Sequence, residues 1–303
     1  MTSARTFATP AAFRIALEER LKRQANAKGT PLNRHRKLFV IDRFLGRLNA
    51  HFGESLLAKG GVALELGLEL ARTTRDLDVS IHGFSRHDPQ GLLGELQDAA
   101  RRDVADQLSF EVRLRAEDEA DIGDAVYGGF RFRVEVALAG RPYEAFPLDV
   151  AFADALTGEP ALWEGTDLLD FVGAPRSRAR LYPRETHVAE KLHAYTRPMP
   201  RPNSRVKDLV DLALLGRGDS FDAPLLRDAL ARTFTRRGTH DVPDRLPQPP
   251  PTWERPYQAM RDDNALPWST IADVYEMARS FLDPLLQGTE GSWVSSSSAW
   301  VRE

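Results

Sequence analysis

Residues 59–81 of the chain are KGGVALELGLELARTTRDLDVSI, and the spacing of glycines and aspartates in this stretch decides the fold class. We expect Gly60 and Gly61 to form a turn, followed by a short helix, a basic turn and a strand that carries Asp76 and Asp78. Side chains alternate along a strand, so two aspartates separated by one residue point to the same face. The stretch therefore predicts two neighbouring carboxylates close to a glycine turn.

Such a pair of carboxylates is typical of a metal site. Two nearby carboxylates repel each other, and a divalent cation relieves the repulsion. Mg²⁺ commonly takes one or two carboxylates from the protein and completes its shell with substrate phosphates. The glycines let the backbone approach a phosphate closely, and N–H groups at a helix start favour an anion. Each motif alone is common, but their order and spacing indicate a Mg²⁺ site that also binds a nucleoside triphosphate (NTP).

This arrangement of motifs resembles the polymerase-β-like nucleotidyltransferase superfamily. The form GG…RxTxDLD is similar to the AbiEii/AbiGii toxin family, which includes the MenT-like toxins. Most members of the superfamily have Gly-Ser where this chain has Gly61-Val62, so the backbone has to supply more of the phosphate contacts here. The nucleotide-binding residues that the resemblance implies are Gly60, Gly61, Arg72, Thr74, Arg75 and Lys191.

The resemblance also implies a third metal-site carboxylate on a strand next to the Asp76–Asp78 strand. Asp149 matches that role because it lies in the middle of the apolar segment FPLDVAFA, residues 146–153. A carboxylate inside an apolar strand is costly to bury unless it has a partner. The alternative interpretation is a strand residue bonded to a nearby arginine.

A second block, AEKL followed by RxKDLVDL, also resembles the AbiEii-type family. We expect Lys191 on a helix over residues 185–195, and Asp208 and Asp211 on the next helix. The resemblance places all three in the active site. A lysine offsets the negative charge of a triphosphate, and an aspartate can orient it or accept a proton. The alternative is a surface pair between Lys207 and Asp211, four residues apart, which contributes little.

Composition excludes several other classes of protein. The chain of 303 residues has no cysteine, which excludes disulfides and thiolate metal sites. It contains no apolar run long enough to span a membrane and no secretory signal, so we expect a cytoplasmic protein with no membrane association. The net charge of −3 argues against a generally basic nucleic-acid binder. Residues 176–207 nevertheless hold nine Lys/Arg against two Glu, which suggests either a positive surface for phosphates or a solvated face.

The expected fold class is α/β, in detail α+β: a polymerase-β-like nucleotidyltransferase core with a small mixed sheet and a mostly helical C-terminal domain. Four segments are expected: N-terminal helices over 1–58, the core over 59–173, the helical domain over 174–286 and a serine-rich, disordered tail over 287–303. Further expectations are a helix over 90–107 and a proline-rich loop over 239–256.

The resemblance implies the toxin of an AbiE-type toxin–antitoxin pair. Such an enzyme transfers a nucleoside monophosphate from an NTP, with a pyrimidine NTP favoured, to the 3′ end of tRNA and blocks aminoacylation. The implied partners are Mg²⁺, the NTP, the tRNA acceptor stem and an AbiEi-type antitoxin. Two alternatives stay open: a small-molecule nucleotidyltransferase of the antibiotic-modifying type, and a catalytically silent nucleotide- or RNA-binding module. The combination of Asp76, Asp78, Asp149 and Lys191 favours catalysis.

Overall fold

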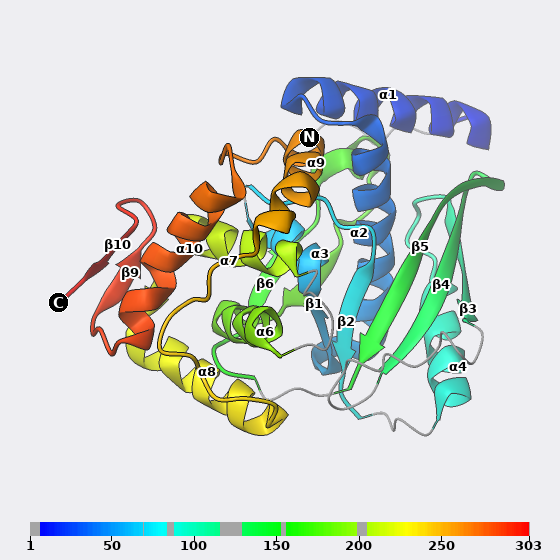
Figure 1. The fold of residues 1–303 in the computed structure, drawn as a ribbon. Helices are drawn as coiled ribbons and strands as arrows, with labels where there is room; N and C mark the ends of the chain where they lie inside the picture. The colour runs from blue at the N-terminus through cyan, green and yellow to red at the C-terminus, as the bar shows by residue number, and fades with distance from the viewer. Residues whose placement is uncertain are drawn as a thin grey trace. The chain divides into compact units, whose positions relative to one another are not determined.

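The computed structural model describes residues 7–68, 70–83, 88–115, 129–152, 156–198 and 205–302. The chain divides into two compact units (Figure 1). The sheet unit contains Met1–Val62, Thr74–Asp154 and Leu162–Leu181, and the helical unit contains Ala63–Thr73, Ala155–Ala161 and Tyr182–Glu303. Each unit is described by itself below, and the boundaries at residues 58, 173 and 286 remain predictions.

The sheet unit is built on a seven-stranded mixed sheet with the strand order β3-β4-β5-β2-β1-β7-β6. Strands β2 and β5 are parallel, as are β1 and β7, whereas β1–β2, β3–β4 and β4–β5 are antiparallel. The expected mixed sheet is therefore confirmed. The strands are β1 (Leu56–Lys59), β2 (Leu77–Ile81), β3 (Leu108–Leu114), β4 (Gly129–Leu138), β5 (Arg141–Ala151), β6 (Ala161–Glu164) and β7 (Arg178–Leu181).

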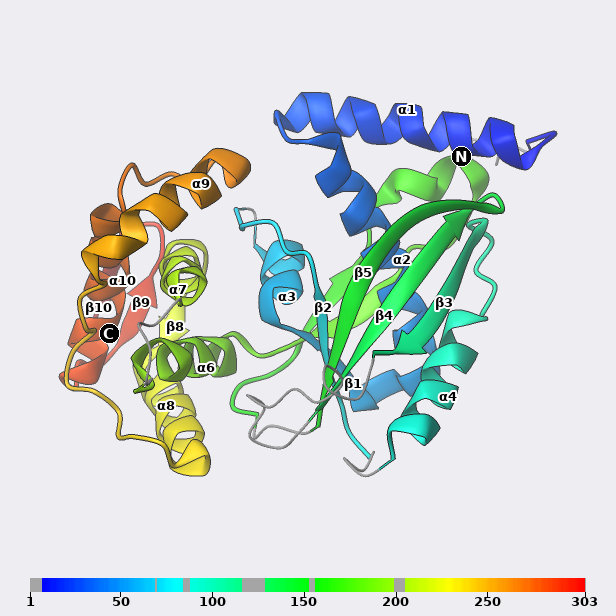
Figure 2. The same cartoon turned by 45° about the vertical axis from the view of Figure 1, so that its right-hand side comes forward.

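One face of this sheet is apolar and packs against helices. Helix α2 (Leu32–Phe52) places the Phe44 ring 5.1 Å from that of Phe110 and 5.7 Å from that of Phe146. Helix α4 (Pro89–Ala100) packs on α2 and β3, and α1 (Pro10–Lys28) crosses α2 (Figure 2). Because side chains alternate along each strand, the polar residues of β2, β4 and β5 lie on the opposite face.

A buried charge cluster ties the segment after α4 to α2. Asp106, which is 0% exposed, accepts hydrogen bonds from Arg47 at 2.8 Å on each carboxylate oxygen and from Arg43 Nε at 2.8 Å. The helix expected over 90–107 ends at Ala100 instead. The chain leaves the helix there because Asp106 has to reach two buried arginines, a long-range pairing that local periodicity does not reveal.

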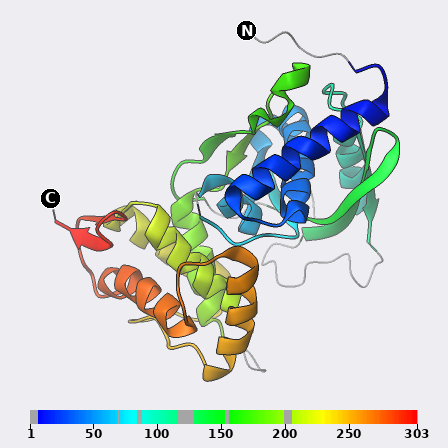
Figure 3. The same cartoon turned by 90° about the horizontal axis from the view of Figure 1, so that it is seen from above.

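Within the described residues, the helical unit contains five complete helices and the end of α3 (Gly60–Gly67), and their apolar side chains fill its core (Figure 3). Asp222 caps α8 by accepting a hydrogen bond from Leu225 N at 2.8 Å, and Thr270 and Asp273 form a capping box on α10. None of the helices described here is long and apolar enough to cross a membrane. The five helices are α6 (Arg184–Thr196), α7 (Val206–Gly218), α8 (Ala223–Arg237), α9 (Glu254–Asn264) and α10 (Ile271–Leu286).

The end of the chain is folded, which corrects the disordered tail expected over 287–303. Strands β9 (Ser292–Val294) and β10 (Ala299–Val301) form a small sheet with β8 (Phe221–Asp222). Trp293 is 0% exposed and donates a hydrogen bond to Gly216 O at 2.6 Å. Four of the serines, residues 295–298, form the turn between the two strands, and Ser292 lies in β9, so the serine content did not indicate disorder here. Similarly, α9 begins inside the loop expected over 239–256.

Candidate functional site

The Asp-x-Asp motif lies where the sequence predicts, at the start of β2. Asp76 and Asp78 are half-buried and the intervening Leu77 is fully buried, as expected for two carboxylates on one face of a sheet. Thr74, which precedes the strand, donates a hydrogen bond from Oγ1 to the backbone oxygen of Asp76 at 3.3 Å. Thr74 thus holds the local chain conformation, while Arg75 is exposed.

Asp78 belongs to a row of four charged residues that crosses the sheet. It is the register partner of Lys59 on β1 and of Asp149 on β5. Asp149 is in turn the register partner of Arg131 on β4. Lys59, Asp78, Asp149 and Arg131 therefore lie side by side on one face, and we call them the charged row. Two central carboxylates are flanked by a cation at each end.

Arg131 binds Asp149 through two hydrogen bonds. Its Nε donates to Asp149 Oδ1 at 2.8 Å and its Nη2 to Oδ2 at 2.7 Å, with Asp149 15% exposed. The bond to Asp149 raises the pKa of Arg131, and the charges of Asp76 and Asp78 add to the effect against the opposing effect of burial. The arginine partner considered for Asp149 is thus present, and a metal-ligand role for Asp149 stays a prediction.

The first glycine of the diglycine turn packs directly on Asp78. Gly60 has φ +65°, and a Cβ at this position would lie 2.0 Å from Asp78 Oδ2. Any other residue would have to displace the carboxylate as well as adopt a strained backbone conformation. Gly60 opens helix α3 (Gly60–Gly67), in which Gly61 is buried. A glycine is therefore required here by space and by conformation.

The carboxylates of the sheet unit fit Mg²⁺ when a nucleotide supplies the remaining oxygens. Within the described ranges, no three acidic or histidine side chains gather into a group that could hold a metal ion unaided. Asp76 and Asp78 provide two carboxylates, the number that Mg²⁺ usually takes from a protein when phosphates complete its shell. Arg131 takes one lone pair on each oxygen of Asp149, so a role for Asp149 as a third ligand stays a prediction.

The helical unit contains the second group of candidate residues. Lys191 Nζ on α6 lies 2.8 Å from Asp208 Oδ1 and 2.9 Å from Asp211 Oδ2, both on α7. Arg72 donates to the same Asp211 from Nε at 2.8 Å and from Nη2 at 2.9 Å. We call Arg72, Lys191, Asp208 and Asp211 the Lys191 cluster. It joins Arg72 to two consecutive helices that lie far from it in the sequence, and its two positive charges balance its two negative charges.

Burial and pairing together fix the protonation states in the Lys191 cluster. Burial alone would lower the pKa of Lys191, but Asp211 and Asp208 raise it well above its usual range. Burial alone would raise the pKa of Asp211, which is 0% exposed, but Lys191 and Arg72 hold it below its usual value. Lys191 is therefore a permanent cation near neutral pH, suited to phosphate rather than to accepting a proton.

The partners of Arg72 and Lys207 in the structure differ from those expected from the sequence. Arg72, a predicted nucleotide-binding residue, pairs with Asp211 and is nearly buried. Lys207 is exposed, and the surface pair between Lys207 and Asp211 is absent because Asp211 points inward to Arg72 and Lys191. Lys59 and Arg131 were not predicted as site residues, because no local pattern shows which strand lies beside Asp78 or Asp149.

Several arginines of the basic block over residues 176–207 pair with acids, and the positive surface considered from the sequence stays a prediction. Arg176 pairs with Asp170 at 2.7 Å, Arg178 with Glu164 at 3.3 Å and Arg184 with Asp219 at 2.6 Å. These three acids lie outside residues 176–207, so a charge count restricted to the block leaves them out.

The comparisons with known proteins agree with the nucleotidyltransferase class that the motifs indicate. A family model described as nucleotidyl transferase AbiEii toxin of type IV toxin–antitoxin systems matches residues 43–276. Since this match spans well over half of the sequence, the chain belongs to the AbiEii family of nucleotidyltransferase toxins.

Two crystal structures from Helicobacter pylori are similar to the chain. One is of JHP933, with 18% identity and a TM-score of 0.45 over 81% of this chain and 90% of that one. The other is of a nucleotidyltransferase candidate, with 18% identity and a TM-score of 0.44 over 82% and 94%. No curated protein sequence matches significantly.

Proposed function

We propose that the protein is a Mg²⁺-dependent toxin that transfers a nucleoside monophosphate from an NTP to the 3′ end of tRNA and so blocks aminoacylation. The observation that carries the proposal is the placement of Asp78 beside Asp149, with Asp76 two residues earlier. Neighbouring carboxylates repel each other and a divalent cation relieves the repulsion, while Gly60 leaves the Asp78 carboxylate the space it needs.

In this proposal Asp76 and Asp78 hold the Mg²⁺ that accompanies the nucleotide. The ion supplies positive charge that lets carboxylates and phosphates share one site and stabilises the leaving pyrophosphate. Thr74 fixes the backbone at Asp76, and Gly60 leaves space next to Asp78. Arg131 holds Asp149 in a fixed orientation beside Asp78.

Lys191 has the properties of a phosphate-binding cation. Two aspartates hold its ammonium group in one place and keep it protonated, yet its side chain is still 16% exposed. Asp211 accepts hydrogen bonds from Arg72 and Lys191, so it acts by positioning the lysine. Asp208 also holds the lysine, and of the two aspartates it is the better candidate for a proton acceptor.

The acceptor, the preferred nucleotide and the partner come from family membership. AbiEii proteins are toxins of type IV toxin–antitoxin systems. This supports an antitoxin partner and a nucleotide substrate. The cytoplasmic location, the AbiEi-type antitoxin, the tRNA acceptor stem as target and the pyrimidine NTP as donor follow from the resemblance to the MenT-like toxins. The basic block over 176–207 adds little to the tRNA assignment, because many of its cations are paired with acids.

The experiment that tests the proposal is a label-transfer assay. Purified protein, Mg²⁺ and total tRNA are incubated with each α-³²P-labelled NTP in turn, with and without EDTA. We expect label on tRNA with one NTP, no label with EDTA and none with Asp78→Asn. The matched control is Asp98→Asn, a change at an exposed aspartate on α4, which should keep full transfer. Label transfer by Asp78→Asn at the wild-type rate would refute the assigned site.

A further inference from the structure

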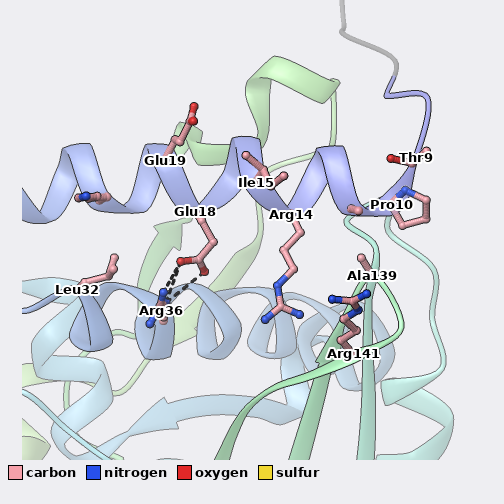
Figure 4. A pocket seen from close by; sticks show the side chains of 12 residues that line it. Thr9, Pro10, Arg14, Ile15, Glu18, Glu19, Leu32, Arg36, Ala139 and Arg141 are labelled. Atoms are coloured by element: carbon pink, nitrogen blue, oxygen red, sulfur yellow. Dashed lines mark hydrogen bonds and ion pairs between the residues drawn. The ribbon is translucent and has the colours of Figure 1, made fainter.

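A cavity of about 800 Å³ lies in the sheet unit between α1, α2 and the turn that joins β4 to β5 (Figure 4). Its volume is in the range of small-molecule sites. Arg141, at the start of β5, is eight residues from Asp149, a strand length of roughly 26 Å at the usual rise per residue. The cavity is therefore separate from the charged row. Its lining is Thr9, Pro10, Ala11, Arg14, Ile15, Glu18, Glu19, Lys22, Leu32, Arg36, Ala139 and Arg141.

The cations of the cavity outnumber its acids, four to two. Glu18 is already fully used: both of its oxygens accept from Arg36 Nε, at 3.1 and 3.0 Å, and Oε1 also accepts from Tyr143 at 2.5 Å. Figure 4 shows Glu18 pointing to Arg36, whereas Glu19 points away from both Arg14 and Arg36. Glu18 is close enough to Arg14 for their charges to interact, but neither Arg14 nor Arg141 forms an ion pair with the lining acids among the described residues.

Arg14 has a buried donor that lacks an acceptor. Its Nη1 is shielded from solvent and has no hydrogen-bond partner among the described residues, although its guanidinium carbon lies 5.4 Å from the ring centre of Tyr143. The exposed side chain of Arg141 likewise makes no ion pair or hydrogen bond within the described part of the chain. Figure 4 shows both side chains extending into the space between α1 and the β4–β5 turn. A buried donor without an acceptor is costly, so this space favours an anion.

We propose that the cavity binds a small phosphate monoester, with its phosphate on Arg14 and Arg141 and its organic part against Ile15 and Leu32. A phosphate monoester carries a charge of about −1.5 to −2 near neutral pH, which matches two guanidinium groups better than a single carboxylate does. Guanidinium groups bind phosphate oxygens in a planar, two-bond geometry. The first turn of α1, which lines the cavity, adds its partial positive charge. This site does not depend on the proposed transferase function.

The test is calorimetric titration of the full chain with phenyl phosphate, a phosphate monoester with an apolar ring, and with benzoate as the carboxylate comparison. We expect saturable binding of phenyl phosphate, and weaker binding of benzoate. Arg141→Gln should weaken the binding of phenyl phosphate by about tenfold or more, the loss of one charge-assisted hydrogen-bonding group. Because Arg141 is exposed, this variant should fold normally.

Two controls separate this site from general charge effects and from the charged row. Arg23→Gln removes an exposed α1 arginine that does not line the cavity, and should leave the affinity unchanged. Asp78→Asn should also bind phenyl phosphate as the wild type does. The proposal is overturned by non-saturable binding to the wild type, by equal affinity of Arg141→Gln and wild type, or by benzoate binding tighter than phenyl phosphate.

Discussion

Asp78 on β2 and Asp149 on β5 are register partners on adjacent parallel strands, and the next residue across the sheet from each is a cation. Lys59 lies beside Asp78, and Arg131 binds Asp149. The protein therefore balances the two carboxylates internally. A metal ion that binds here competes with these cations for the same negative charge.

Arg131→Gln should strengthen metal binding in the absence of nucleotide. Removing one cation near Asp149, Asp76 and Asp78 should tighten the binding of Mn²⁺ about fivefold, a change of about 1 kcal/mol for a partly screened charge. Electron paramagnetic resonance of free Mn²⁺ measures this affinity. Arg133→Gln is the control, because Arg133 is an exposed arginine on the same strand. Unchanged or weaker binding by Arg131→Gln would show that Arg131 does not compete with the metal.

Gly60→Ala should abolish nucleotidyl transfer with only a modest loss of stability. The new Cβ would displace the Asp78 carboxylate, whereas the left-handed backbone costs about 1–2 kcal/mol. Gly29→Ala is a matched control, because Gly29 has φ +61° and nothing within 4 Å of the added Cβ. We expect similar losses of unfolding free energy in both variants, measured in urea, and full transfer only in Gly29→Ala. Normal transfer by Gly60→Ala would contradict the close packing on Asp78.

Arg72→Met should destabilise the helical unit strongly. The change leaves Asp211 buried with only Lys191 as its partner, and breaking a buried ion pair from one side costs about 3–5 kcal/mol. Chemical denaturation followed by circular dichroism measures the loss. Asp228→Asn, which breaks an exposed helix pair with Arg232, should change stability by less than about 0.5 kcal/mol. A loss for Arg72→Met no larger than this control would contradict the buried pairing.

His193 should make stability depend on pH between about 6.5 and about 4. Burial and the nearby Arg237 lower the pKa of His193 to about 4, whereas an unfolded histidine has a pKa of about 6.5. In this window the unfolded state binds more protons, so the free energy of unfolding falls as the pH falls and levels off below about 4. Denaturant titrations of wild type and His193→Asn across this window should show a shallower pH slope in the variant. Identical slopes would mean that His193 titrates normally.

Trp293→Ala should show that the C-terminal strands belong to the folded core. Trp293 is fully buried and bonded to Gly216 O, and truncating a buried tryptophan costs about 3–5 kcal/mol. Val301→Ala, at a half-exposed position of β10, should cost less than about 0.5 kcal/mol. Thermal unfolding of both variants tests this. If Trp293→Ala unfolds at the wild-type temperature, the tail contributes nothing to stability.

The parts of the site that sequence motifs describe were predictable, because they depend on neighbours along the chain. Strand alternation predicts that Asp76 and Asp78 share one face. Helical periodicity predicts the helix that carries Asp208 and Asp211. The resemblance to the AbiEii family, now confirmed, connected these to Lys191. The distances between Lys191 and both aspartates agree with that connection.

Other contacts depend on the order of strands in the sheet or on long-range packing. Arg131 meets Asp149 only because β4 lies beside β5, and an arginine in an alternating strand looks like any other solvent-facing residue. The helix expected over residues 90–107 is shorter than predicted because Asp106 pairs with arginines of α2. This contact is also long-range and is not visible in the local sequence. Residues 287–303 were expected to be disordered because they are rich in serine. The burial of Trp293 and its hydrogen bond to Gly216 O stabilise a folded conformation there instead.

The most direct measurement of the central claim is mass spectrometry of tRNA 3′-terminal fragments after incubation with the protein, Mg²⁺ and all four NTPs. The account predicts fragments heavier by one or more nucleoside monophosphates with the wild type and with Asp98→Asn, and unchanged fragments with Asp78→Asn. Unchanged 3′ fragments with folded wild-type protein would contradict transfer to the 3′ end of tRNA.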